Sequence, residues 1–184
     1  LQYYGFVEQG NPHDVYIMPP LRDWDIDALE SICGRSFGSD RLLKIDRAGL
    51  LGSTNNINND EVEGESINTL GGIIVSRTGG IDPAVMQALR AMVSSDPDWQ
   101  DAGEAVGNFV EKVSDENERL ARLAAKTELE AELKKKSTTI EDDEKLLRQL
   151  KGSKSIVASE KELCAIQFRI EKKKVLEDAI KKLE

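Results

Sequence analysis

Apolar residues near the start of the chain are spaced as in short β-strands. The segments 3–7 and 15–17 are rich in aromatic and β-branched residues, and the turn sequence Gly10-Asn11-Pro12 separates them. Pro19-Pro20 ends the second segment. Two such short pieces do not form a stable sheet alone, so we expect them to pair with other strands. The Ile-Ile-Val run at 73–75 is a further candidate strand.

Apolar positions recur at helical spacing over most of the remaining chain, which predicts a mainly α fold. Asp25 is a fair N-cap for a helix that ends near Cys33. Asp82-Pro83 begins another helix, which Asp96-Pro97-Asp98 is expected to end. Further helices are expected at residues 102–113, 115–135 and 156–183. Residues 137–143 are expected to start another helix, which breaks at Gly152-Ser153. Each has one apolar stripe and a polar back, which is typical of a helical bundle.

A polar segment at residues 53–66 interrupts the apolar patterns. It is rich in Asn, Gly and acidic side chains. Such a composition cannot bury enough apolar area to offset the entropy lost on ordering the chain. We therefore interpret 53–66 as an Asn-rich mobile loop within a connector that covers residues 21–72.

The overall charge narrows the possible functions. The 184 residues carry 25 Lys and Arg against 34 Asp and Glu, a net charge of −9. We expect no nucleic-acid partner, because phosphate binding depends on Lys and Arg, and an acidic surface instead favours a protein partner. No apolar run approaches the ~20 residues of a membrane helix. Cys33 and Cys164 lack metal-like spacing and are expected to be reduced thiols.

The other charged features are interpreted as structural. His13 follows Asn-Pro in a predicted turn, with no nucleophile nearby in the sequence. The acidic residues 141–144 are consecutive on a helix and point around it, so they predict no metal site, and the helix dipole explains them. The lysine runs 134–136 and 172–174 are expected to be solvated ends of helices.

Four motifs in order along the chain resemble one family. They are Tyr4-Gly5-Phe6 followed by Asn11-Pro12, the segment IVSRT at 74–78, the capped acidic helix start TTIEDDEKLL at 138–147, and RIEKKKVL at 169–176. Together they resemble the SET-domain protein lysine methyltransferases of the Rubisco large-subunit methyltransferase type. The last motif has its Glu-Lys shifted by one residue, and Lys-Lys-Lys-Ser at 134–137 stands where the family often has a Tyr.

The resemblance implies roles for two aromatic residues. Tyr4 would line the narrow channel that admits the substrate lysine, and Phe6 would lie against the adenine of S-adenosylmethionine. An aromatic wall attracts an amine by roughly 1–2 kcal/mol, and stacking on a base contributes roughly 1–3 kcal/mol. The alternative is that Tyr3, Tyr4 and Phe6 are ordinary residues of a sheet core.

The resemblance also implies a domain organisation. Residues 1–20 would be the C-terminal remnant of a SET domain, 21–72 a connector, and 73–184 a helical substrate-binding domain. The cofactor loop, an Asn-His pair and the catalytic tyrosine would precede Leu1. We therefore expect no catalytic residue in this fragment, and S-adenosylmethionine only in the full-length parent.

By the same resemblance, the parent would be a protein-lysine N-methyltransferase. This part of it would bind and orient a protein that carries the target lysine, and we expect it to be a monomer. Relatives of this type act in the chloroplast or in the cytoplasm and nucleus.

A second interpretation needs no methyltransferase. The chain would then be a non-catalytic helical protein-interaction module, or a short coiled coil built on residues 156–184. Lys173-Lys174 interrupts a strict heptad there, which weakens the coiled-coil pattern. A self-associating helix would melt in a concentration-dependent way, whereas a helix within one domain would not.

Overall fold

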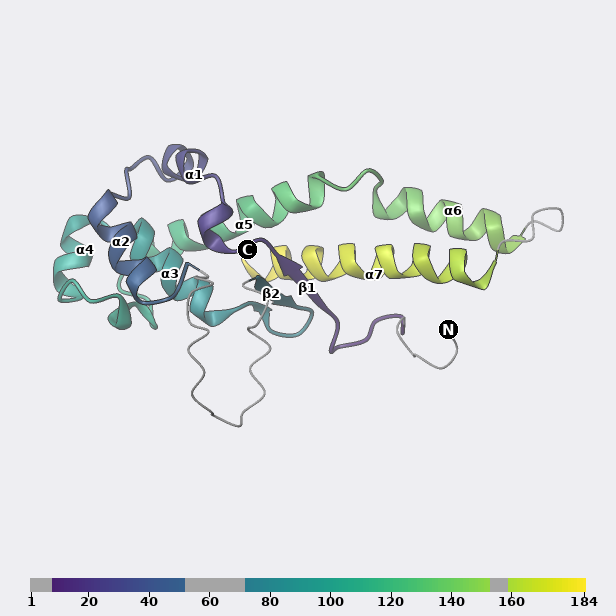
Figure 1. Ribbon diagram of the computed structural model, residues 1–184, viewed down its shortest axis with the longest axis horizontal. Coiled ribbons are helices and arrows are strands. Elements are labelled where there is room, and N and C mark those ends of the chain that lie inside the picture. Colours follow the sequence, from purple (N-terminus) through teal and green to yellow (C-terminus); the bar gives the residue numbers. More distant parts are fainter. Residues whose placement is uncertain (1–7, 52–71, 153–158) are drawn as a thin grey trace.

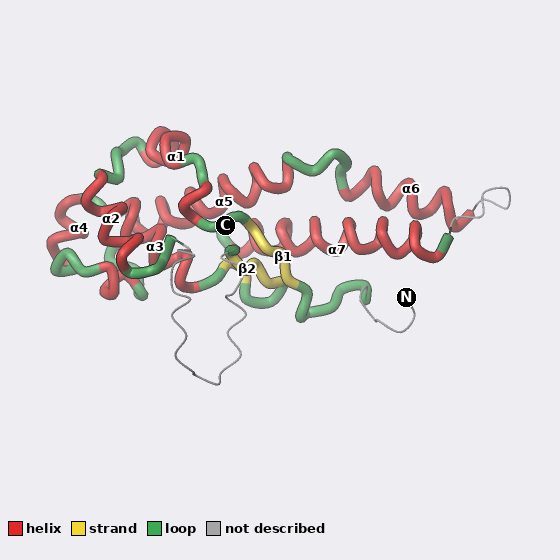
Figure 2. The backbone as a smooth tube through the Cα atoms, in the orientation of Figure 1, coloured by secondary structure: helices red, strands yellow, loops and turns green. Residues whose placement is uncertain are grey.

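The computed structural model describes residues 8–51, 72–152 and 159–184, and its architecture is mainly α with one small sheet (Figures 1 and 2). The expected fold class is therefore confirmed. The helices are α1 (Ile26–Cys33), α2 (Ser39–Arg47), α3 (Pro83–Val93), α4 (Asp96–Asp101), α5 (Asp115–Lys134), α6 (Ile140–Gly152) and α7 (Glu160–Lys182), with 3-10 helices η1 (Leu21–Asp23) and η3 (Val106–Phe109).

The sheet is antiparallel, with strands β1 (Val15–Met18), β2 (Ile73–Ser76) and β3 (Gly80–Ile81) in the order β1-β2-β3. The expected strands at 15–17 and 73–75 are thus confirmed, and they pair with each other within this chain. Tyr16 lies opposite Val75 and Met18 opposite Ile73. Gly72 permits this close approach, because a Cβ there would lie 2.5 Å from Ile17 Cγ2.

Capping residues explain where several helices begin. Asp25 accepts a hydrogen bond from Ala28 N at 3.0 Å, and Asp82 accepts one from Ala84 N at 2.8 Å. Each bond satisfies a backbone N–H that has no partner within its helix. The predictions of helices near 25–33, 82–93, 115–135 and 140–152 are confirmed, and α7 is confirmed from Glu160 onward.

The predicted helix over 102–113 is wrong. Residues 102–113 instead form a loop after α4, the short helix η3 and a second loop before α5. Gly103 and Glu104 have φ values of +60° and +55°, so the chain leaves the helical conformation directly after α4. Asp96-Pro97-Asp98 begins α4 instead of only ending α3, because Ser95 and Asp98 form a reciprocal capping box.

The core is centred on α3 and continues into the segment expected to be a connector. Leu89 is fully buried, and α3 packs against α5, α2 and η3. Phe37 and Ile45 also belong to this core, so residues between 21 and 51 supply helices and buried side chains. The boundary at residue 73 remains a prediction, and the predicted loop 53–66 lies outside the described residues.

The molecule is elongated (Figure 1). Helices α1 to α4 gather at one end, and α6 lies alongside α7 at the other. The sheet and α5 lie between them, and α7 runs from the far tip back to this middle region, where it packs against α5 and all three strands. None of the helices in the described ranges is long and apolar enough to cross a membrane.

Candidate functional site

The two predicted site residues, Tyr4 and Phe6, lie outside the described residues. The structure does describe the segment that follows them. Residues 8–14 run along α7 before they enter β1, as Figure 1 shows. The contacts of this segment define how residues 8–14 join the helical part.

Glu171 of α7 is the main anchor of this segment. Its carboxylate, only 2% exposed, accepts hydrogen bonds from Gly10 N at 3.0 Å and from Arg77 Nη2 at 2.9 Å. Gly10 has a φ of +75°, a left-handed conformation that glycine adopts without strain. Burial would raise the pKa of Glu171, but the bonds from Gly10 and Arg77 outweigh it and lower the pKa. Glu171 is therefore a charged anchor between the entering segment and α7.

A basic hollow lies next to this anchor. It has a volume of about 420 Å³ and is bounded by β1, the turn between α5 and α6, and the middle of α7. The name refers to its five Lys and Arg side chains. The lining residues are Tyr16, Lys135, Lys136, Ser137, Thr138, Phe168, Arg169, Lys172 and Lys173.

Tyr16 forms one wall of the basic hollow. Its hydroxyl donates to Glu132 Oε1 at 2.6 Å and accepts a bond from Lys136 Nζ, which also lies 4.9 Å from the centre of the tyrosine ring. Burial raises the pKa of Tyr16, and the bond to Glu132 raises it further. Tyr16 is therefore held as a neutral hydroxyl, and Lys136 keeps its charge at the edge of the basic hollow.

A buried ion pair lies at the basic hollow, because Lys173 of this pair is one of its lining residues. Lys173 and Asp143 are 4% and 1% exposed, and Lys173 Nζ lies 2.7 Å from Asp143 Oδ2. Arg169 also donates to Asp143, through Nη2 at 2.7 Å. Burial would raise the pKa of Asp143, but the bonds from Lys173, Thr138 and Arg169 lower it. This network joins the two motifs at 138–147 and 169–176.

The expectation that Lys172–Lys174 is a solvated run is wrong at its central member. The burial of Lys173 could have been inferred from the sequence. Lys173 lies three residues from both Ile170 and Leu176, on the apolar stripe of α7. Asp143 similarly lies three residues before Leu146. A charge at such a position is buried, and a buried charge needs a partner of opposite sign.

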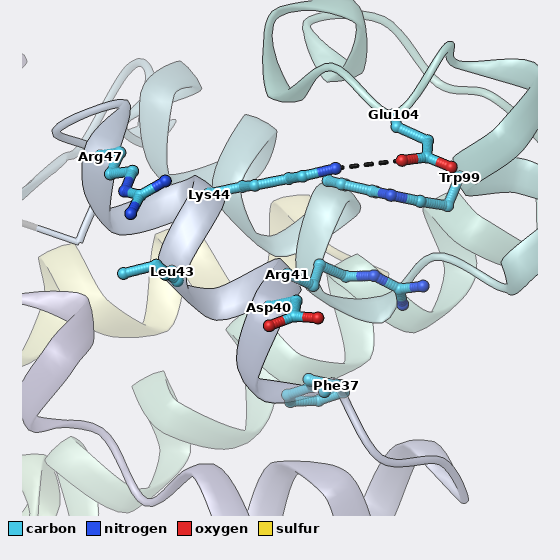
Figure 3. A pocket seen from close by; sticks show the side chains of 9 residues that line it. Phe37, Asp40, Arg41, Leu43, Lys44, Arg47, Trp99 and Glu104 are labelled. Atoms are coloured by element: carbon cyan, nitrogen blue, oxygen red, sulfur yellow. Dashed lines mark hydrogen bonds and ion pairs between the residues drawn. The ribbon is translucent and has the colours of Figure 1, made fainter.

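A second hollow, of about 460 Å³, lies between α2 and α4 (Figure 3). Trp99 stacks on Phe109 with 5.3 Å between ring centres, and Arg41 lies 5.0 Å from the centre of the Trp99 ring. Lys44 pairs with Glu104 at 3.1 Å across the opening. Its cations and carboxylates are mixed, so this hollow has no dominant charge.

His13, Cys33 and Cys164 line neither of the two hollows. His13 is exposed in a turn, and its backbone N–H donates to Asn11 Oδ1 at 2.9 Å. Cys33 is buried, Cys164 is half-buried, and both are free thiols. Within the described ranges, no group of three or more His, Cys, Asp or Glu side chains is placed to hold a metal ion.

The described residues form a mainly helical domain with hollows on its surface. The family described as Rubisco LSMT substrate-binding matches residues 41–176. This match covers most of the chain, so the chain belongs to that family. The matched range 41–176 includes every lining residue of the basic hollow except Tyr16. No curated protein and no solved structure matches the chain.

Proposed function

We propose that this chain is the C-terminal part of an S-adenosylmethionine-dependent protein-lysine N-methyltransferase, in which it binds and orients the protein substrate. The observation that carries the proposal is the family match over 41–176, combined with the Tyr4-Gly5-Phe6 motif a short distance before β1. The substrate is a protein with a target lysine, and the chain acts as a monomer.

The anchor at Glu171 supports this role. Transfer to an amine requires donor and acceptor to be held in line, and small displacements lower the rate strongly. In this proposal Tyr4 lines the lysine channel and Phe6 lies against the cofactor, which supplies the methyl group when it is bound. Glu171, which Arg77 holds in place, then fixes Gly10, four residues after Phe6, relative to α7.

The test compares the 184-residue chain with a longer protein that includes the residues encoded upstream of Leu1. We expect the longer protein to transfer a labelled methyl group to a protein in a cell extract, and the chain alone to transfer none. The chain alone should also bind S-adenosylmethionine negligibly in a calorimetric titration.

Micromolar binding of S-adenosylmethionine by the chain alone, or no labelling by the longer protein, would contradict the proposal. A reading frame that begins immediately before Leu1 would also contradict it. The hollows would then belong to a non-catalytic interaction module.

A further inference from the structure

We propose that the basic hollow binds an acidic segment of the protein substrate, with an apolar side chain of that segment against Phe168. This inference rests on the proposed function and names the class of substrate surface. It assigns a ligand chemistry to the side chains of the basic hollow.

The charge of the basic hollow is opposite to that of the whole chain. Five cations line it, and none of the described residues that line it is acidic. Three carboxylates, those of Asp14, Glu132 and Asp143, pair with these cations from outside the lining. Two positive charges remain in excess, in a chain of net charge −9. A ligand with two or more carboxylates would balance this local excess.

Two of the cationic side chains, Arg169 and Lys135, are partly exposed and can donate further hydrogen bonds to a ligand. The Arg169 side chain is 48% exposed and uses Nη2 for Asp143. The remaining N–H groups of its guanidinium can donate to a carboxylate of a ligand. The Lys135 side chain is 63% exposed and has Glu132 at 3.3 Å as its partner within the described part of the chain. Lys173, in contrast, spends its donors on Asp143 and Thr138 and is structural.

Phe168 supplies an apolar surface beside these charges. It is 45% exposed, and Lys172 Nζ lies 4.9 Å from the centre of its ring. A single exposed apolar side chain is common, but an aromatic ring inside a charged hollow suits an amphipathic peptide. A long polyanion such as nucleic acid would meet the negative charge of the whole chain. A short acidic segment experiences mainly the field within about 8 Å.

The experiment uses the full chain and three fluorescent peptides of equal length. One carries Asp, Glu and Leu, the second carries phosphoserine in place of the acids, and the third is neutral. A single-stranded oligonucleotide is the fourth probe. The hollow variant is Lys135→Glu with Arg169→Gln. The matched control is Lys145→Glu with Arg148→Gln, which makes the same change of charge at exposed positions of α6.

We expect the acidic peptide to bind best, and the hollow variant to weaken its binding by about tenfold. A few partly exposed ion pairs together contribute about 1.4 kcal/mol, the free energy of a tenfold change. Phe168→Ser should also weaken binding, whereas the control variant should leave it unchanged. Equal affinity of both charge variants, or tighter binding of phosphopeptide or oligonucleotide, would overturn the inference.

The same variants separate this inference from the proposed function. In the longer protein, the hollow variant should raise KM for the protein substrate and leave kcat nearly unchanged. Methyl transfer with an unchanged KM would overturn the basic hollow as a substrate site and leave the proposed function intact. Peptide binding at the basic hollow without methyl transfer by the longer protein would overturn the proposed function and leave the site intact.

Discussion

Lys173 lies on the apolar stripe of α7, between Ile170 and Leu176, and is nonetheless a well-bonded side chain. Its ammonium group donates to Thr138 and Asp143, so the buried charge has a partner of opposite sign. Removing one partner of such a pair lowers stability by more than the pair itself contributes, because the other charge stays buried alone. The pair is therefore a sensitive point of the fold.

Asp143→Asn should destabilise the chain by about 3 kcal/mol, because Lys173 would remain buried without a counter-charge. The free energy of unfolding from urea denaturation measures this. Asp101→Asn is the matched control, since Asp101 is exposed, and should change stability by less than about 0.5 kcal/mol. Equal effects of the two substitutions would contradict a structural role for the buried pair.

The lowered pKa values of Asp143, Glu171 and Glu118 predict a loss of stability in acid. Burial opposes the lowering at Asp143 and Glu171, and their hydrogen bonds outweigh it. At Glu118, near the start of α5, the largest cause of the lowered pKa is the hydrogen bond that Arg90 Nε donates at 2.6 Å. A depressed pKa in the folded state stabilises above the unfolded value of about 4, and this stabilisation disappears as pH falls through the folded value.

Urea midpoints should therefore be similar at pH 7 and pH 5 and fall steeply below about pH 4. The fall should be smaller in the double variant Asp143→Leu with Lys173→Leu, which lacks one of the titrating groups. A midpoint that stays constant down to pH 2.5 would show that these carboxylates are not held as ions.

Three consecutive residues of α7, which point in different directions, bond to the entering segment 8–14, to the sheet and to α6. Glu171 holds Gly10 and Arg77, Lys172 donates to Val15 O at 2.8 Å, and Lys173 holds Asp143. Successive residues of a helix are rotated by about 100°, so one turn can contact the entering segment, the sheet and α6. This turn of α7 sets the position of β1 relative to α6.

Glu171→Gln should lower the free energy of unfolding by about 2 kcal/mol, because Arg77 loses its buried charged partner. It should also increase amide exchange at Gly10, whose N–H donates to the carboxylate. Hydrogen exchange measured by NMR reports both effects. Glu111→Gln is the matched control at an exposed position. Unchanged exchange at Gly10 would contradict the anchoring role.

On the scale of the whole molecule, one core extends across the predicted domain boundary. Met18, Leu21, Leu29, Phe37 and Ile45 are each at most 2% exposed and pack with residues of α3 and α5. The chain before residue 73 thus shares its buried surface with the chain after it. This arrangement predicts that the two parts fold together.

The segment 73–184 expressed alone should lose cooperative thermal unfolding, monitored by circular dichroism at 222 nm. The five core side chains named above are all absent from 73–184. Each contributes roughly 1.5–3 kcal/mol, and their sum approaches the whole stability of a typical domain. The control is a chain that begins at residue 8, which keeps every described contact and should melt like the full chain. A cooperative melt of 73–184 within a few degrees of the full chain would support the boundary at 73.

Local patterns along the sequence predicted the strands β1 and β2, the helix starts at Asp25 and Asp82, and the approximate extents of α3, α5 and α6. These features depend on neighbours a few residues apart, such as a cap and its N–H or an apolar stripe. The helix predicted over 102–113 was wrong because Gly103 and Glu104 leave the helical conformation. The motifs also led to the family to which the chain belongs.

The sequence by itself therefore determined the mainly α fold, most of the elements and the family. Only the tertiary structure decided which strand pairs with β1, and that Glu171, Lys173 and Asp143 are buried ions. It alone brought Tyr16, Lys136 and Phe168 to one hollow. These residues are 32 to 152 positions apart in the sequence. Their neighbours depend on how α7 packs against the sheet and α6. The spacing of residues along one element carries no information about such contacts.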